Sequence, residues 1–248
     1  MNGYIHVEDA AVLLDNILTR EYLIHRIEGG EFIGKRVKER YYISKETFEW
    51  LKRILLKKDY SDVREIEKNI DEVDFNKIKI KGSIIDIGGG GEGISGRRYG
   101  KMVVSIDKSL RELLETKNDS IKIVSDGMRL PFKEKTFDNS TAFFAFMYMP
   151  VKTRKIVMAE IHRVLRERGM LYVFEPKISS AHYRPMTLLS VYLTVKAGKE
   201  KIHTGYGAVL AKSAQSRTHF TAIAKENGFV LEEHFDFKDH FILVFAKA

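Results

Sequence analysis

The sequence predicts an α/β protein with a doubly wound, mostly parallel sheet of seven strands, an antiparallel C-terminal hairpin and an N-terminal helical cap. Three observations support this fold class. From residue 84 onward, short apolar runs alternate with helical segments, which is typical of parallel sheets covered by helices on both faces. Glycines follow the first apolar run and acidic residues follow the first three, as at strand ends that form a ligand site. Two final apolar runs lie close together and predict the hairpin.

The composition fits a globular protein and excludes several kinds of site. The chain has 248 residues, 44% of them hydrophobic, and a net charge of +8 that is spread along its length. The absence of cysteine excludes disulfides, thiolate metal ligands and cysteine nucleophiles. No histidine pair has metal-ligand spacing with matching carboxylates, so we expect no metal site.

Nothing in the sequence indicates a membrane protein. The first ten residues hold two acids, Glu8 and Asp9, and no basic stretch, so they do not resemble a signal peptide. The uncharged run Met186–Val195 is about half the length that spans a bilayer. We therefore expect a cytoplasmic protein.

Residues 1–80 are predicted to be a helical cap, and residues 81–248 are predicted to be the catalytic domain. The apolar residues that mark one face of a first helix are Val12, Leu13, Ile17 and Leu18, with Leu14 as a further candidate. Gly29–Tyr42 holds two glycines and the basic run Lys35–Arg40, and it is interpreted as a loop. Ser44 is the predicted N-cap of a helix. Ser61 and Asp62 are predicted to begin another helix.

The catalytic domain begins with the apolar run at residues 84–87. The strands predicted after it are Met102–Ile106, Ile121–Val124, Asn139–Phe146, Met170–Phe174, Val230–Phe235 and His240–Ala246. Helices are predicted at Thr153–Arg166 and Thr218–Glu226. The long insertion of residues 177–213 is interpreted as a lid, with Gly205 and Gly207 as its hinges.

The central feature is the stretch Ile84–Gly93, which reads IIDIGGGGEG. A buried strand that ends in glycines and turns into a helix brings backbone N–H groups close to a ligand. Gly88, Gly90 and Gly93 fit the dinucleotide fingerprint G-x-G-x-x-G of NAD enzymes. Asp86, Gly88 and Gly90 fit the nucleoside-binding loop of methyltransferases that use S-adenosylmethionine (SAM). The glycine loop alone leaves both cofactors open.

The acids after the first three strands favour SAM. Asp107 lies about 20 residues after Gly88, where an acid accepts hydrogen bonds from the ribose diol of either cofactor. Asp126 follows the third strand and is placed to accept from an adenine amino group, while the N–H groups after it meet the ring. Asp86 would repel a pyrophosphate but suits the ammonium and sulfonium charges of SAM.

On these residues, the stretch Ile84–Pro176 resembles the class I SAM-dependent methyltransferases, whose fold is Rossmann-like. Within that family it is similar to the branch of quinone-biosynthesis C-methyltransferases and small-molecule enzymes. The similarity is carried by residues 126–132 (DGMRLPF), by Phe137-Asp138, and by residues 160–165 (EIHRVL) followed by Gly169.

The resemblance implies roles for individual residues. The cofactor-binding residues that it implies are Asp86, Gly88, Gly90, Asp107, Asp126, Gly127, Met128 and Phe143. Asp86, Gly88 and Gly90 would hold the methionine end of SAM, and Asp107 would hold its ribose. Asp126, Gly127 and Met128 would hold the adenine. Phe143, with Phe144 beside it, would line the site near the methyl group.

The chain departs from the family pattern at positions that concern the acceptor. Glu92 stands where a glycine is usual, and Met147-Tyr148 stands where two histidines are common. The candidates for a base that takes a proton from the acceptor are Tyr148, Glu175 and a histidine of the insertion, His182 or His203.

The predicted activity is methylation, the transfer of a methyl group from SAM to a small-molecule acceptor. One alternative is an NAD-dependent oxidoreductase, which the glycine pattern and Asp107 also fit. Another is a methyltransferase or SAM-binding protein that acts on nucleic acid, suggested by Lys35–Arg40 and Lys196–Lys201. The fourth strand is not followed by the Asn/Asp-Pro-Pro-aromatic signature of base-methylating enzymes, which disfavours nucleic acid as the partner.

Overall fold

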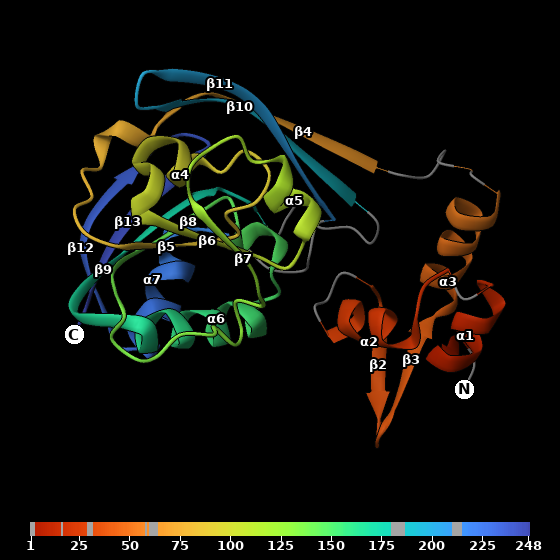
Figure 1. Cartoon of the computed structure of the whole chain (residues 1–248). Coiled ribbons are helices and arrows are strands. Elements are labelled where there is room, and N and C mark those ends of the chain that lie inside the picture. Colours follow the sequence, from red (N-terminus) through yellow and green to blue (C-terminus); the bar gives the residue numbers. More distant parts are fainter. Residues whose placement is uncertain are drawn as a thin grey trace. The chain divides into compact units, whose positions relative to one another are not determined.

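The computed structural model describes residues 3–15, 17–28, 32–57, 59, 64–179, 187–209 and 215–248. The chain divides into two compact units. The first unit comprises Met1–Glu67, Ser179–Ser190 and Gly207–Ser213, and the second comprises Lys68–Ile178, Val191–Tyr206 and Ala214–Ala248. Figure 1 shows the elements of both units.

A seven-stranded sheet forms the centre of the second unit. Its strands are β5 (Ile84–Ile87), β6 (Val103–Asp107), β7 (Ile121–Val124), β8 (Phe137–Phe143), β9 (Leu165–Pro176), β12 (Phe229–Asp236) and β13 (His240–Lys247). They lie in the order β12-β13-β9-β8-β5-β6-β7. The strands from β9 to β7 pair in parallel, whereas β13 pairs antiparallel with β9 and β12. The predicted fold class is confirmed, and each predicted strand overlaps an observed one.

Helices connect these strands and pack on the sheet. They are α4 (Ile94–Tyr99), α5 (Leu110–Glu115), α6 (Val151–Val164) and α7 (Arg217–Glu226). One apolar face of α6, which includes Val157, Ile161 and Val164, is buried in the core with residues of β5, β8, β9 and β13. All four residues of β5 are buried, as expected for a central strand covered on both sides. None of the described helices is long and hydrophobic enough to span a lipid bilayer.

The insertion contains a long β-hairpin. Its strands β10 (Thr187–Ala197) and β11 (Glu200–Val209) form a three-stranded sheet with β4 (Arg64–Asp74), in the order β11-β10-β4. Gly205 and Gly207, predicted as hinges, lie within β11 and not at a boundary between elements. The role of the insertion as a lid stays a prediction.

The helix predicted to begin at Ser61 is wrong over the part that the structure describes. Residues 64–74 form strand β4, in which half-buried and buried residues alternate with exposed ones up to Ile70. Glutamate and lysine in this segment favour helix, but period-two burial and pairing in a sheet override that preference. Ser61 and Asp62 lie outside the described residues.

Short helices and a small sheet form the first unit. Its elements are β1 (Tyr4–His6), α1 (Val7–Leu13), α2 (Arg20–Glu28), β2 (Gly34–Val37), β3 (Arg40–Ser44), α3 (Lys45–Lys52) and a π-helical turn (Arg53–Lys57). The strands pair antiparallel in the order β1-β3-β2. The predicted N-cap is confirmed, because Oγ of Ser44 accepts a hydrogen bond from N–H of Thr47 at 3.1 Å.

Two predictions for the first unit are wrong. The segment interpreted as a loop, Gly29–Tyr42, contains β2 and the start of β3, joined by a tight turn in which Lys38 has a positive φ of 55°. The apolar face of α1 is also misplaced, because Val12 and Leu13 are exposed, as is Ile17 after the helix. Of the predicted residues Leu14 is buried, and the others buried there are Val7, Ala10 and Ala11. Their spacing is helical, but two of them are alanines, which give a weak apolar signal.

Candidate functional site

The glycine stretch forms a tight turn between β5 and α4, at the carboxyl edge of the sheet. Gly88 and Gly93 have φ angles of 71° and 56°, a conformation that favours glycine. A Cβ atom on Gly88 would lie 2.7 Å from Cβ of Ala145, and one on Gly90 would lie 2.6 Å from Cβ of Glu112. The turn is therefore packed against its neighbours so closely that side chains are excluded from it.

Backbone hydrogen bonds fix this turn against β6. The N–H groups of Gly88 and Gly89 both donate to the carbonyl of Ile106, at 2.9 and 3.0 Å. The N–H group of Gly91 donates to the carbonyl of Glu112 at 3.0 Å. A ligand that binds to this loop meets a backbone that needs little further ordering.

Asp86 lies in β5 below the loop and is buried. Its Oδ1 accepts hydrogen bonds from the hydroxyls of Ser95 (2.9 Å) and Thr141 (2.7 Å). Burial raises the pKa of its carboxyl group to about 6, although the two hydrogen bonds oppose the shift. Its Oδ2 lies beside Gly89, where a Cβ atom would be 2.7 Å away. Asp86 therefore joins β5, α4 and β8 beneath the loop, and its contact with an ammonium group stays a prediction.

The other two predicted acids lie at the ends of neighbouring strands. Asp107 ends β6, and its Oδ1 accepts a hydrogen bond from N–H of Ser109 at 2.8 Å. Asp126 follows β7; its Oδ1 accepts from N–H of Met128 at 2.9 Å, and its Oδ2 pairs with Lys108 at 2.9 Å. Because β6 and β7 pair in parallel, both carboxylates lie at the same edge of the sheet as the glycine loop.

Gly127 and Met128 lie in the turn after Asp126, and both are half-buried. The side chain of Met128 packs against the core of the second unit. A Cβ atom on Gly127 would make only ordinary contacts, the nearest 3.5 Å from Val157. Unlike the loop after β5, this turn does not need its glycine for packing within the protein.

An aromatic cluster lies where β8 ends. Phe143, a predicted wall residue, stacks on Phe144 with ring centroids 4.9 Å apart. Phe144 has a φ of 50°, which is uncommon outside glycine, and its N–H donates to the carbonyl of Phe174 at 2.8 Å. The ring of Phe143 also lies 6.0 Å from that of Phe75 and 5.4 Å from that of Phe174. The end of β8 is thus held in one conformation by packing and by β9.

Tyr206 of β11 completes this cluster, and it is absent from the predicted site residues. Its ring centroid lies 5.3 Å from that of Phe144 and 6.3 Å from that of Phe143. Burial raises the pKa of its hydroxyl above the usual value, and the carboxylates of Glu92 and Asp86 add to the shift. The hydroxyl is therefore a neutral donor near the acidic side of the site. The signal in the sequence is a Gly-Tyr-Gly pattern, one aromatic side chain between two small ones.

Glu175 is placed differently from what its predicted role requires. It is fully buried at the end of β9. Its Oε1 accepts from N–H of Phe146 at 2.6 Å, and its Oε2 accepts from Nε2 of Gln215 at 2.5 Å. Burial raises its pKa to about 8, against the opposing effect of the Arg154 guanidinium. Arg154 in turn donates to the carbonyls of Phe146 and Met149 at 3.1 and 2.8 Å. Both carboxylate oxygens are thus occupied by protein donors that fix the segment after β8.

Tyr148 is the accessible member of the two predicted catalytic residues. It ends the 3₁₀ turn η4 (Phe146–Tyr148), which follows β8, and it is 46% exposed. It also contributes to the raised pKa of Tyr206, so the two hydroxyls lie on the same side of the site.

The histidines of the insertion give no further base at this edge of the sheet. His203 forms a hydrogen bond with Thr194 at 2.9 Å, between β10 and β11. His182 lies outside the described residues. In the part of the chain that is described, no group of three or more His, Asp and Glu side chains is arranged to hold a metal ion.

Glu92, the departure from the family pattern, is connected to the insertion through Arg97. Nη2 of Arg97 lies 3.6 Å from the carboxylate of Glu92, and Nη1 lies 3.0 Å from that of Glu200. Nε of Arg97 also donates to the carbonyl of Glu92 at 2.7 Å. The arginine is 18% exposed and links the glycine loop to the start of β11.

Comparison with known proteins gives a match to the same part of the chain. A family model described as a methyltransferase domain matches residues 85–173. One similar solved structure is a SAM-dependent methyltransferase from Methanosarcina mazei, with 15% identity, a TM-score of 0.48, and an alignment that covers 69% of this chain and 95% of that one. A second, from Mesorhizobium loti, has 12% identity, a TM-score of 0.49, and covers 69% of this chain and 94% of that one. A TehB-like SAM-dependent methyltransferase from Corynebacterium glutamicum has 18% identity, a TM-score of 0.48, and covers 70% of this chain and 84% of that one. No curated protein sequence matches the chain.

Proposed function

We propose that this chain is a class I SAM-dependent methyltransferase, on the match of residues 85–173 to a methyltransferase domain, and that it methylates a small-molecule acceptor that binds beside Tyr206. SAM supplies the methyl group together with its own leaving group. One observation supports our assignment of the cofactor residues: Asp86, Asp107 and Asp126 lie on or just after three neighbouring parallel strands, at the edge of the sheet that carries the glycine loop. The family match sets aside the alternative of an NAD-dependent oxidoreductase.

The charges around the loop fit a cationic ligand. Carboxylates attract an ammonium and a sulfonium group and would repel a pyrophosphate. Asp126 pairs with Lys108, but the side chains are 38% and 58% exposed, and exposed ion pairs contribute little stability. The carboxylate of Asp126 is therefore available to an adenine amino group, and that of Asp107 to a ribose diol.

We assign the adenine to the turn at Gly127 and Met128. Packing within the protein does not require a glycine at position 127, since a Cβ atom there would have no contact closer than 3.5 Å. A flat adenine ring that lies against the backbone would explain the glycine, because a side chain at position 127 would take the space of the ring.

We assign the acceptor to the aromatic cluster of Phe143, Phe144 and Tyr206. Buried aromatic walls with few polar groups suit a small apolar or aromatic molecule. The hydroxyl of Tyr206 stays protonated, so it donates a hydrogen bond that orients the acceptor. Tyr148 is the accessible candidate for a base. Glu175 acts as a positioning residue, because it holds η4 and with it Tyr148.

Calorimetry with S-adenosylhomocysteine tests the cofactor residues. We expect the wild type to bind, and Asp107→Ala to bind at least about tenfold more weakly, since a hydrogen bond to a charged group contributes about 1.5–3 kcal/mol. Asp119→Ala is the matched control, because Asp119 is an exposed acid of the same region, and its affinity should not change. Equal loss in both variants, or no binding by the wild type, would contradict the assignment. An NADH titration by fluorescence should show no binding.

A further inference from the structure

The first unit has a hydrophobic core of its own, to which the methyltransferase site contributes nothing. The core consists of Val7, Ala10, Ala11, Leu14, Leu23, Phe32, Ile43, Phe48, Trp50 and Leu51. It shares no residue with the core of the second unit. A segment with a separate core is organised as a separate module, so a function of its own has to be considered.

Helices α1 and α2 of this unit follow each other in the chain and share one core, which is the order of elements in a helix-turn-helix. Ala10 and Ala11 on α1 are buried together with Leu23 on α2, and the small alanine side chains let the two helices approach closely. Thr19 caps α2, because its Oγ1 accepts from N–H of Tyr22 at 3.2 Å and its carbonyl accepts from N–H of Leu23 at 3.1 Å. In this motif the second helix is the one that enters the major groove of DNA.

The outer face of α2 is polar and accessible. Leu23 faces the core, whereas Arg20, Glu21, Tyr22 and His25 are exposed. The helix has nine residues, and an α-helix with its side chains is about 10–12 Å across, which fits the width of the major groove, about 12 Å. These side chains can donate to and accept from base edges.

A basic hairpin follows α2. The strands β2 and β3 pair from Gly34↔Ile43 to Val37↔Arg40, and Figure 1 shows that the hairpin extends beyond α1 and α2 of the same unit. Arg36, Lys38 and Arg40 on it are all exposed. The acid in the turn, Glu39, accepts a hydrogen bond from Arg36 at 2.8 Å. We name this hairpin, Gly34–Ser44, the wing.

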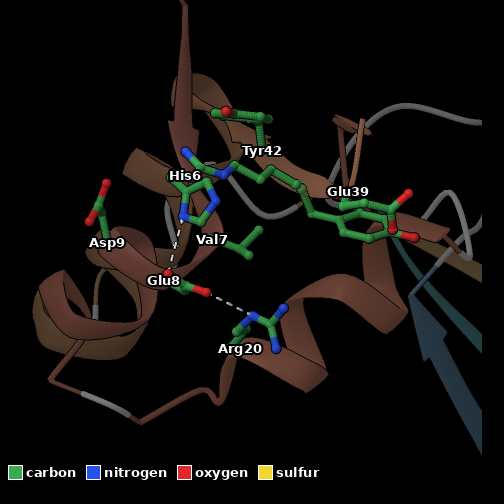
Figure 2. Close-up of a pocket in the computed structure, with 9 residues that line it drawn as sticks. His6, Val7, Glu8, Asp9, Arg20, Glu39 and Tyr42 are labelled. Carbon is green, nitrogen blue, oxygen red and sulfur yellow. Dashed lines mark ion pairs between the residues drawn. The ribbon is translucent and has the colours of Figure 1, made fainter. Parts of the chain in front are cut away.

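A hollow of about 440 Å³ lies between the start of α1, the start of α2 and the outer part of the wing, from its turn to the middle of β3. The residues that line it are His6, Val7, Glu8, Asp9, Arg20, Glu39, Arg40, Tyr41 and Tyr42. Figure 2 shows Glu8 between His6 and Arg20, with ion-pair distances of 3.7 and 3.2 Å. Glu8 thus fixes the first turn of α2 on α1, and its charge, like that of Glu39, is balanced by an arginine.

We propose that the first unit is a winged helix-turn-helix module that binds duplex DNA. Helix α2 lies in the major groove, and Arg36, Lys38 and Arg40 of the wing contact the neighbouring phosphates. A single-stranded ligand is disfavoured because the tyrosine rings of the wing are already in contact with other side chains: the guanidinium of Arg36 lies over the ring of Tyr41, 5.6 Å from its centroid, and His6 meets Tyr42 edge to face with centroids 5.2 Å apart. This function is independent of SAM binding.

Fluorescence anisotropy of the full chain with a labelled mixed-sequence duplex tests the proposal. The wing variant is Arg36→Ala, Lys38→Asn, Arg40→Ala; asparagine preserves the positive φ at position 38. Its matched control removes three exposed lysines of the second unit, Lys101→Ala, Lys117→Ala and Lys133→Ala. We expect the wing variant to bind at least about tenfold more weakly, with a salt slope smaller by about 2.7, at about 0.9 per phosphate contact. The control should keep the affinity and slope of the wild type.

Three results would overturn the proposal: no salt-dependent binding by the wild type, equal loss in the wing variant and the control, or tighter binding to single-stranded RNA of the same length. If the triple variant does not fold, Lys38→Asn alone replaces it in the test, and its salt slope should be smaller than that of the wild type by about 0.9. S-adenosylhomocysteine calorimetry on the same samples separates this proposal from the methyltransferase, because the wing variant should bind that ligand as the wild type does.

Discussion

Glu175 is a carboxyl group whose ionisation opposes folding. Burial raises its pKa to about 8 from an ordinary value of 4.5, so the folded protein binds this proton more tightly than the unfolded chain does. The stability that the proton contributes is fully present below about pH 4.5 and is lost as the pH rises through about 8. We therefore expect the free energy of unfolding of the wild type to fall over this interval.

The variant Glu175→Gln removes the titration and keeps the shape of the side chain. We expect its free energy of unfolding to change less than that of the wild type between about pH 5 and about pH 8, as measured by urea denaturation. Glu232→Gln, at an exposed position of β12, should follow the wild type. If Glu175→Gln showed the same pH dependence as the wild type, the proposed protonation of Glu175 would be wrong.

Gly127 allows cofactor binding and stability to be separated at one residue. In Gly127→Ala the new Cβ atom meets nothing closer than 3.5 Å, so the free energy of unfolding should stay within about 1 kcal/mol of the wild type. The affinity for S-adenosylhomocysteine should nevertheless fall at least about fivefold, because the methyl group occupies space assigned to the adenine. Gly88→Ala is the contrasting variant and should be destabilised. Unchanged affinity in Gly127→Ala would place the adenine elsewhere.

Among the elements, the hairpin β10–β11 is tied to the glycine loop by Arg97. In Arg97→Ala the contacts to Glu92 and Glu200 are lost, and we expect hydrogen exchange of the first residues of β11 to become roughly two- to fivefold faster, the range of a partly exposed ion pair. Arg111→Ala is the control, because Arg111 is exposed and pairs with Glu115 on α5 instead. Equal exchange in both variants would show that Arg97 does not hold the hairpin.

An element or site residue could be predicted from the sequence where neighbouring residues determine it, and could not where a contact with a distant part of the chain determines it. The strands of the large sheet follow from apolar runs in the sequence, and parallel pairing then brings Asp107 and Asp126 to one edge, so both were predictable. Strand β4 and Tyr206 were not, because their partners, β10 and Phe144, are distant in the chain. The burial of Glu175 likewise depends on Gln215, some 40 residues later, and no local pattern reports it. The quinone-biosynthesis branch stays a prediction.

At the scale of the whole molecule, two separate cores predict two unfolding transitions in calorimetry. S-adenosylhomocysteine should raise the midpoint of the transition of the second unit, since a ligand at 100 times its dissociation constant adds about 2.7 kcal/mol to the state that binds it. The other transition should stay where it is. A common shift of both transitions would mean that the two units unfold as one. The role of the first unit as a cap over the site stays a prediction.

The place of β13 in the sheet affects how the protein is synthesised. β13 is the last strand of the sheet in chain order, yet it pairs with β9 along its length, from His240↔Pro176 to Ala246↔Met170. While the ribosome is still making the segment between them, the edge of β9 on the side away from β8 is unpaired. Such edges pair readily with other chains, so the nascent chain carries a site for unwanted pairing until its final strand arrives.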